Sequence, residues 1–135
     1  MSSRDNVENM MKSLFYVREE NLDAPIIVEG PNDIRALRRL GFKGKIFTLP
    51  RNKTLQQFAE KISLDYSRII LLMDWDSRGK RNMSLLEKYL RHHGVNVDVD
   101  FWRLCFSMAS RMSNVESLPA AYEWILTEYG TDQHT

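Results

Sequence analysis

Two aspartates, Asp74 and Asp76, follow directly on an unbroken apolar run in the stretch IILLMDWDSRG. A third acid, Glu29, ends another apolar run, PIIVE. Carboxylates packed together repel one another unless protons or a cation compensate their charge. Ligand sets made only of oxygen favour a hard cation such as Mg²⁺ or Mn²⁺. If the three acids converge, they therefore predict a site for a divalent metal ion.

Local roles could also explain each acid separately. Acids at the end of a strand often cap the loop or helix that follows, so the Asp74–Asp76 pair alone is weak support for a metal site. Asp33 falls in the first turn of a predicted helix, where the helix dipole favours an acidic side chain. The position of Glu29 at the end of a second strand is what favours the metal site over these local roles.

Strands and helices alternate along the middle of the chain, and this pattern decides where the acids lie. Apolar and β-branched runs predict strands at residues 25–29, 45–49, 68–73 and 95–100. Helices are predicted between Gly30 and Gly41, at 54–63 with Thr54 or Asn52 as the cap, and at 80–94. Such alternation is typical of an α/β fold, a parallel sheet with helices on both faces.

Further helices are expected on either side of this core. Apolar residues at three- and four-residue steps predict a helix at 3–20, and two closing helices are predicted at 101–112 and 115–130, before a frayed tail. The length fits one domain, residues 1–135, with a core at about 24–100 and a C-terminal helical extension at about 101–130.

The order of the strands determines whether the acids can meet. In the order 2-1-3-4, strands 1 and 3 are neighbours and the order reverses between them. Open α/β sheets bind ligands at such a point, outside the carboxyl ends of the strands. If Asp74 and Asp76 continue strand 3, they face one side and Trp75 faces the other. We therefore expect Glu29, Asp74 and Asp76 in one crevice.

Basic side chains flank this predicted crevice and could hold the phosphates of a nucleic acid. They follow strand 2 or the acid pair: Arg51, Lys53, Arg78, Lys80 and Arg81. Helix amides after Gly79 could add to the anion site. A solvated loop would explain each basic residue taken alone. The net charge is only +1, so any attraction to nucleic acid must come from a local patch.

Other features of the sequence indicate the cellular compartment in which the protein works. Cys105 is the one cysteine, which rules out an intramolecular disulfide and suits a reducing compartment. No apolar run approaches the roughly 20 residues of a spanning helix, and the N-terminus lacks the apolar core of a signal peptide. We therefore expect a cytoplasmic protein with no membrane partner. The aromatic residues Phe101, Trp102 and Phe106 could stack bases, but core packing is favoured.

The two acidic stretches together resemble the signature motifs of the Toprim domain, which is shared by topoisomerases, primases and several nucleases. The first motif is a strand ending in Glu-Gly with a following Asp, here Glu29, Gly30 and Asp33. The second is Asp-x-Asp-x-x-Gly, here Asp74, Asp76 and Gly79. On DWDSRG and NVESLPAAYEW, the whole chain is most similar to the small stand-alone archaeal Toprim proteins, whose function is not characterised.

This resemblance implies a role for each motif residue. Glu29 would be the general acid or base in phosphoryl transfer, and Asp74 and Asp76 would hold Mg²⁺ or Mn²⁺. One departure from the family is Pro31, because many nuclease and primase members carry lysine there. Two functions stay open: Mg²⁺-dependent phosphoryl transfer or hydrolysis on RNA or DNA, for example RNA cleavage, and a non-catalytic metal-binding module that works with nucleic acid or a ribonucleoprotein.

Overall fold

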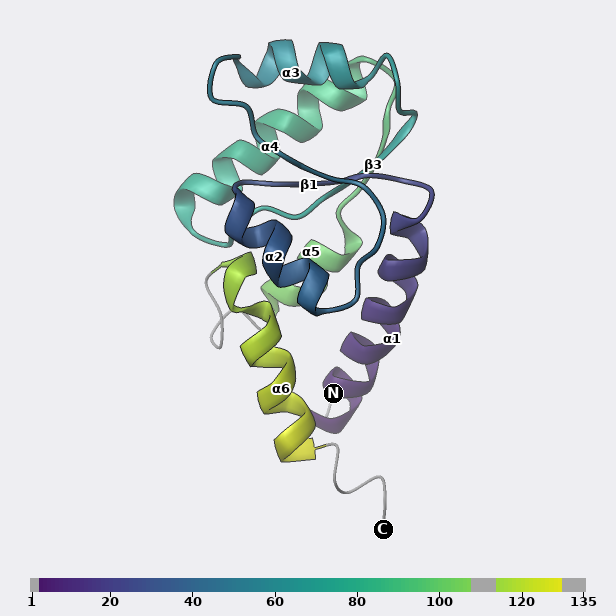
Figure 1. Cartoon of the computed structure of the whole chain (residues 1–135), viewed down its shortest axis with the longest axis vertical. Helices are drawn as coiled ribbons and strands as arrows, with labels where there is room; N and C mark the ends of the chain where they lie inside the picture. Colours follow the sequence, from purple (N-terminus) through teal and green to yellow (C-terminus); the bar gives the residue numbers. More distant parts are fainter. Residues whose placement is uncertain (1–2, 108–113, 130–135) are drawn as a thin grey trace.

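A four-stranded parallel sheet lies at the centre of the computed structural model, which describes residues 3–107 and 114–129 (Figure 1). The strands are β1 (Ile26–Val28), β2 (Ile46–Thr48), β3 (Arg68–Leu71) and β4 (Asn96–Asp98), in the order β2-β1-β3-β4. In the register, Ile26 of β1 stands opposite Ile46 on one side and Ile70 on the other. The α/β class and the 2-1-3-4 order predicted from the sequence are confirmed.

Helices cover both faces of the sheet, as Figure 1 shows. One face carries α3 (Leu55–Ile62) and α4 (Ser77–His92); the other carries α1 (Ser3–Asn21), α2 (Pro31–Arg39), α5 (Asp100–Phe106) and α6 (Leu118–Tyr129). A short 3₁₀ helix, η2 (Val115–Ser117), precedes α6. α1 and α6 project from the sheet in the same direction and carry the two ends of the chain.

The strand side chains alternate between two cores, because successive residues of a strand point to opposite faces of the sheet. Ile26, Val28 and Ile70 pack with α1, α2, α5 and α6. Ile27 and Ile69 pack with α3 and α4. The two central strands, β1 and β3, are apolar apart from Arg68, as expected for a parallel sheet that is covered on both faces, whereas the edge strand β4 also carries Asn96 and Asp98.

The helix ends follow the predicted signals. Pro31 is the first residue of α2, and the Thr54 hydroxyl, not Asn52, caps α3 by accepting a hydrogen bond from the backbone N–H of Gln57 at 3.1 Å. Gly41 (φ 92°) and Gly94 (φ 80°) follow α2 and α4 in the left-handed conformation that glycine adopts without strain.

Several element boundaries differ from the prediction: for example, β4 ends at Asp98, and a 3₁₀ turn precedes α6 where one helix was expected. β3 ends at Leu71, two residues early, and α4 begins at Ser77 because the carboxylate of Asp76 caps its first turn. α5 ends at Phe106. The rest of the helix expected over 101–112 lies partly in 108–113, outside the described residues, as does the tail after residue 129.

Buried polar contacts fix the C-terminal end of α1 to the sheet. The side-chain amide of Asn21 donates to the carbonyls of Ala24 (3.1 Å) and Lys45 (3.0 Å), and its oxygen accepts from the N–H of Gly44 (2.9 Å). A Cβ on Gly44 would lie 1.8 Å from the carbonyl oxygen of Asn21. Glycine is therefore required where α1 meets the start of β2.

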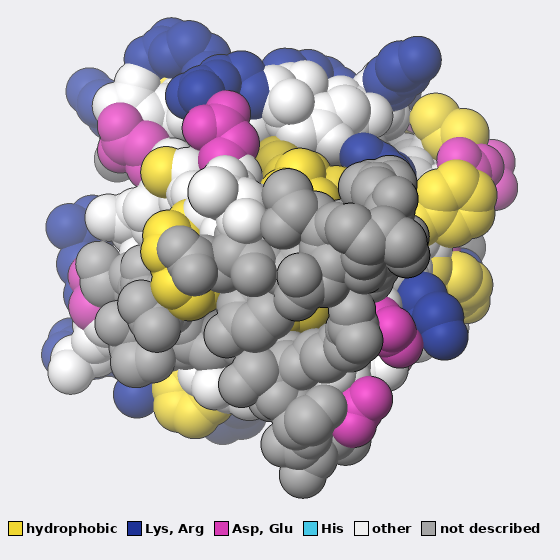
Figure 2. Space-filling model, turned by 90° about the horizontal axis from the view of Figure 1, so that it is seen from below, with side chains coloured by type: hydrophobic (Ala, Val, Ile, Leu, Met, Phe, Trp, Pro, Cys, Tyr) yellow, Lys and Arg dark blue, Asp and Glu magenta, His cyan; other side chains and the backbone are white. Residues whose placement is uncertain are grey.

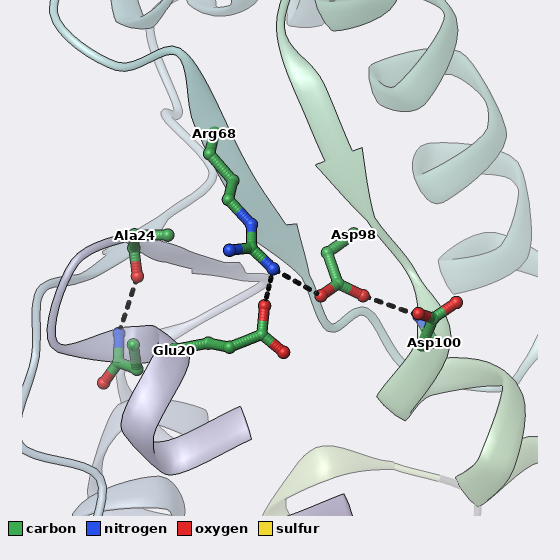
Figure 3. A network of polar contacts seen from close by, with 6 residues as sticks. Glu20, Ala24, Arg68, Asp98 and Asp100 are labelled. Atoms are coloured by element: carbon green, nitrogen blue, oxygen red, sulfur yellow. Dashed lines mark hydrogen bonds and ion pairs between the residues drawn. The ribbon is translucent and has the colours of Figure 1, made fainter. Parts of the chain in front are cut away.

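An ion-pair network joins α1 to two strands, as Figure 3 shows. The Arg68 guanidinium of β3 contacts Glu20 of α1 and lies 3.5 Å from Asp98 of β4. Asp98 also accepts a hydrogen bond from the N–H of Asp100 at 2.9 Å, at the start of α5. The network therefore connects elements from both ends of the chain.

Charge is spread around the molecule. Figure 2 looks at the end toward which α1 and α6 project: Lys and Arg side chains gather along the upper rim, and both signs occur around the rest of the edge. This distribution agrees with the net charge of +1. No helix among the described residues is long and apolar enough to span a bilayer.

Candidate acidic site and adjoining basic crevice

Glu29 follows β1 and is the most perturbed acid of the site. Its Oε1 atom is buried and has no hydrogen-bond partner among the described residues. Burial, the negative charge of Asp74, a hydrogen bond shared with Asp74 and the charge of Asp76 together raise the pKa of Glu29 to about 7, against the opposing effect of Arg78. Near pH 7 Glu29 is therefore present in both its protonated and its ionised form.

Asp74 lies in the loop after β3, where the C-terminal part of the chain holds it. Its Oδ1 atom accepts a hydrogen bond from the backbone N–H of Val115, the first residue of η2, at 2.9 Å. The sequence did not predict this contact. NVESLPAAYEW is similar to the family, but nothing in its composition points to Asp74.

Asp76 has a local structural role. It is exposed, and its Oδ1 atom accepts a hydrogen bond at 2.7 Å from the N–H of Gly79, which makes it the N-cap of α4. Asp74 and Asp76 therefore do not continue the strand, contrary to the condition stated for them. Trp75 nevertheless points into the core, where it is buried with residues of α1, α2, α5 and α6.

The two motif glycines, Gly79 and Gly30, differ in the space that surrounds their Cα atoms. A Cβ on Gly79 would lie 2.2 Å from the carbonyl oxygen of Asp74, so the first turn of α4 can approach the acidic loop only at a glycine. A Cβ on Gly30 would meet nothing within 4 Å. The space beside Gly30 belongs to the crevice described below.

Asp33 is buried, and it organises the start of α2. Its Oδ2 atom accepts a hydrogen bond from the N–H of Gly30 at 3.0 Å. Burial raises the pKa of Asp33, the bond from Gly30 opposes this, and the charges of Asp74 and Glu116 add to the rise. The local role predicted for Asp33 is thus present, and Glu116 is a further acid nearby that sequence reasoning missed.

The expected convergence of acids is partial. Glu29 and Asp74 are neighbours, and Asp76 is close enough to influence Glu29. However, the described residues contain no group of three His, Cys, Asp or Glu side chains arranged to hold a metal ion. The donor chemistry fits a hard cation, because every candidate ligand atom is a carboxylate oxygen and the buried Oε1 of Glu29 lacks a donor.

A crevice of about 820 Å³ opens beside Glu29 at the carboxyl edge of the sheet. Arg51 and Lys53, from the loop after β2, line it together with Arg78 of α4. Three of the five predicted basic residues are thus brought to the same space as Glu29. Lys80 and Arg81 are exposed on the first turns of α4 and do not line the crevice.

Aromatic rings pack beside the acidic loop. The indole N–H of Trp75 donates to the carbonyl of Trp102 (3.1 Å), and the indole N–H of Trp102 donates to the carbonyl of Met73 (3.0 Å). Trp102 stacks between Trp75 and Phe106, and the Lys80 ammonium lies 4.9 Å from the centre of the Phe106 ring. Phe101 is buried in the core and Trp102 packs against it, as favoured from the sequence, whereas the Phe106 side chain is exposed.

Comparison with known proteins gives the same picture of family and fold. A family model described as the Toprim domain matches residues 24–102. A UPF0292 protein of Thermoplasma volcanium is 37% identical over 106 residues, which cover 78% of this chain and 88% of that protein. One from Methanocaldococcus jannaschii is 27% identical over 112 residues, covering 82% and 88%. A solved structure of a protein from Aquifex aeolicus has a similar fold, with a TM-score of 0.62, 22% identity and coverage of 86% and 97%.

Proposed function

This chain belongs to the Toprim family and groups with the archaeal UPF0292 proteins, and on that premise we propose that it carries out Mg²⁺-dependent phosphoryl transfer or hydrolysis on nucleic acid. The observation that carries the proposal is the state of Glu29. Its pKa of about 7 lies near neutrality, and it lines the same crevice as Arg51, Lys53 and Arg78. An acid-base group and phosphate-binding cations thus share one space.

Glu29 is the proposed general acid or base. Proton transfer is most effective when the pKa of the catalytic group lies near the working pH, since both forms are then populated. The ionised form would take a proton from the attacking water or hydroxyl group. The protonated carboxyl that results would then give this proton to the leaving oxygen of the phosphodiester.

Asp74 and Asp76, with Glu29, are the proposed ligands of Mg²⁺ or Mn²⁺. Each aspartate uses its Oδ1 atom to accept a backbone hydrogen bond, which would leave its second carboxylate oxygen available as a ligand. A bound cation would supply charge neutralisation for the phosphoryl oxygens. A cation would bind the ionised form of Glu29, so affinity for the ion should rise as the pH rises through the pKa of this residue.

The basic residues would position the nucleic acid. Arg51, Lys53 and Arg78 line the crevice and would hold phosphates next to the reacting one. Lys80 and Arg81 lie outside it and would contact phosphates further along the strand. These contacts carry no base information, so this part of the interface would act on many sequences.

A non-catalytic role is the second candidate, and Pro31 is the observation that favours it. Pro31 begins α2 on the wall of the crevice, where many nuclease and primase members carry lysine. Proline brings neither a charge nor an N–H to that wall. In this role the acids would bind a metal ion within a nucleic-acid or ribonucleoprotein assembly without turnover.

A cleavage assay separates the two functions. Labelled single-stranded and hairpin RNA, single-stranded DNA and duplex DNA are incubated with the protein in Mg²⁺, Mn²⁺ or a chelator. If the protein is an enzyme, cleavage products should form only when a metal ion is present. Glu29→Gln should then reduce the cleavage rate by about a hundredfold or more, because the proton-transfer group is lost. Glu60→Gln, an exposed acid of α3 away from the crevice, is the matched control and should keep full activity. Binding without products from any substrate would refute the enzyme and leave the binding module.

A further inference from the structure

A second groove adjoins the acidic crevice and plays no part in the chemistry described above. It has a volume of about 380 Å³ and lies between β2, α3 and the loop before β3. Pro50 and Lys53 line both the groove and the crevice, so the two spaces are adjacent at these residues. A ligand held in the groove would therefore extend toward Glu29.

The walls of the groove are aromatic and apolar. Phe47, Phe58, Ile62 and Tyr66 form them, with Ile62 buried and the three rings half-buried. Phe47 and Tyr66 contact each other with ring centres 5.7 Å apart and planes tilted by 58°. The ammonium of Lys45 donates to the Tyr66 hydroxyl at 3.1 Å and lies 5.6 Å from the centre of its ring, which holds the ring in place.

The rim of the groove is positively charged. Lys53 and Lys61 lie close to each other, and the proximity of the Lys61 ammonium lowers the pKa of Lys53. Neither forms an ion pair with an acid in the described part of the chain. Two neighbouring ammonium groups favour an anion between them, because an anion relieves the repulsion. Asn52 adds a hydrogen-bonding group at the same rim, and Asp65 adds one negative charge, so the rim keeps a net positive charge.

We propose that this groove, made by Phe47, Phe58, Ile62 and Tyr66 with Lys53 and Lys61 at its rim, binds one unpaired nucleobase and its phosphate. The inference rests on the proposed function and adds to it the form of the substrate, a single strand. A base has a flat π-face that stacks on aromatic side chains whatever its sequence. The phosphate of that nucleotide lies at Lys53 and Lys61, and the strand continues into the crevice.

The geometry disfavours a double-stranded ligand at this groove. A base can enter only when both of its faces and its pairing edge are free, which is the condition in single strands, loops and ends. The groove also falls within the size range of small-molecule sites, roughly 300–1,000 Å³, which suits one base. An acidic peptide carrying an aromatic side chain is the competing occupant, and the test includes it.

The proposed nucleobase-binding groove, called the base groove below, can be tested by fluorescence anisotropy with the full chain. A chelator is present, so the measurement reports binding without turnover. The probes are labelled single strands of oligo-deoxythymidine and oligo-uridine, about ten nucleotides long, and an abasic strand of equal length and charge. The wild type should bind each base-bearing strand at least about tenfold more tightly than the abasic strand, because only the former can stack. The two base-bearing strands show whether RNA or DNA is preferred.

Two variants locate the effect, and each has a control. Tyr66→Leu should reduce affinity for base-bearing strands toward that of the abasic strand and leave abasic binding unchanged. Tyr89→Leu, which alters a half-buried aromatic residue of the same core outside the groove, should leave the preference intact. Lys61→Ala should weaken binding of base-bearing and abasic strands alike, whereas Lys88→Ala, exposed on α4, should not. Phe58→Leu, which keeps the apolar volume, serves as an independent check if Tyr66→Leu unfolds.

The outcomes distinguish this inference from the proposed function. Equal affinity for base-bearing and abasic strands, or a base preference unaffected by Tyr66→Leu and Phe58→Leu, would overturn the base groove while leaving phosphate binding at the crevice intact. A peptide that contains glutamate and tyrosine is the other probe. If it binds in a Tyr66-dependent way and strands show no base preference, the groove is a peptide site and the base-binding proposal is wrong. Failure of every strand to bind, with or without Mg²⁺, would instead refute the nucleic-acid function itself.

Discussion

The carboxylate of Asp74 accepts a hydrogen bond from the backbone N–H of Val115, which lies 41 residues further along the chain. The contact links the acidic loop after β3 to η2, the 3₁₀ turn that leads into α6. It leaves Asp74 beside Glu29, whose pKa it raises. The acidic site therefore depends on a segment beyond the residues 24–102 that match the Toprim domain.

Asp74→Asn should separate charge repulsion from metal affinity. The amide keeps an oxygen for the N–H of Val115 but removes one negative charge next to Glu29. The metal-free variant should therefore keep its stability or gain some. Mn²⁺ should raise the Tm of the wild type but not that of the variant. Calorimetric titration checks the affinity. Equal Mn²⁺ binding by the wild type and an Asp74→Asn, Asp76→Asn double variant would refute the metal site.

Glu29→Gln should change how stability depends on pH. The pKa of Glu29 is raised from its ordinary value of 4.5 to about 7, so between these values the folded state binds more protons than the unfolded state. Wild-type stability should therefore fall as the pH rises through this window. The variant cannot ionise here, so it should be more stable than the wild type above about pH 7.

The size of this gain is limited by solvent around Glu29. We expect on the order of 1 kcal/mol, because partial exposure screens the charges. Urea unfolding at about pH 8 and about pH 4 measures the difference, which should disappear at the lower value because both folded and unfolded wild type are then protonated. A gain that persists unchanged at low pH would show that the raised pKa is not its cause.

Gly79→Ala and Gly30→Ala form a matched pair. The new Cβ on residue 79 would lie 2.2 Å from the carbonyl of Asp74 and must displace α4 or the acidic loop, at a cost of about 2–4 kcal/mol. At residue 30 it meets no atom within 4 Å, so stability should change by less than about 1 kcal/mol. Denaturant unfolding measures both. Equal costs at the two positions would contradict the close approach seen at Gly79.

Asp76→Ala and Asp76→Asn should divide the capping role from the metal role. Asparagine can still accept the hydrogen bond from the N–H of Gly79, so Asp76→Asn should leave α4 intact. Asp76→Ala removes the cap and should cost about 1 kcal/mol. Both should weaken Mn²⁺ binding if Asp76 is a ligand. Thermal unfolding of the two variants measures the capping role, and titration with Mn²⁺ measures the metal role. Unchanged Mn²⁺ affinity in both variants would show that Asp76 caps α4 but is not a metal ligand.

Lys80→Ala and Arg81→Ala should weaken nucleic-acid binding in a way that depends on salt. Removal of one phosphate-binding cation should reduce the slope of log affinity against log salt by about one. Both residues lie outside the crevice, so affinity for Mn²⁺ should not change. Binding measured across several salt concentrations provides the slope, with Lys88→Ala as the exposed control on the same helix. If both single variants leave the slope unchanged, Lys80 and Arg81 do not contact phosphates of the nucleic acid.

The sequence predicted the parts of the structure that depend on local periodicity and chain order. Apolar runs located the strands, and their alternation with helices led to the 2-1-3-4 sheet that brings Glu29 near Asp74. The start of α4 was missed because its large buried side chains begin only at Met83, which hid the capping role of Asp76. The bond from Val115 could not be foreseen, because a backbone N–H carries no sequence signal.

The base groove shows the same limit. Its walls come from β2, α3 and the loop before β3, so Phe47 and Tyr66 meet only after the sheet and helices have packed. Neither residue belongs to a motif, and each reads in the sequence as ordinary core. Only the packed structure shows that their rings border an open space next to Lys53.

The stacked pair of Trp75 and Trp102 also gives the protein an optical reporter of its own. Trp75 is the residue between Asp74 and Asp76. Its indole N–H donates a hydrogen bond to the backbone carbonyl of Trp102, and the centres of the two rings lie 6.4 Å apart. Two indoles at this separation couple electronically, so a small rotation of one changes the near-ultraviolet circular dichroism of both. Any ligand that shifts the acidic loop would thus be visible in an unlabelled sample, and occupancy could be followed in real time by light alone.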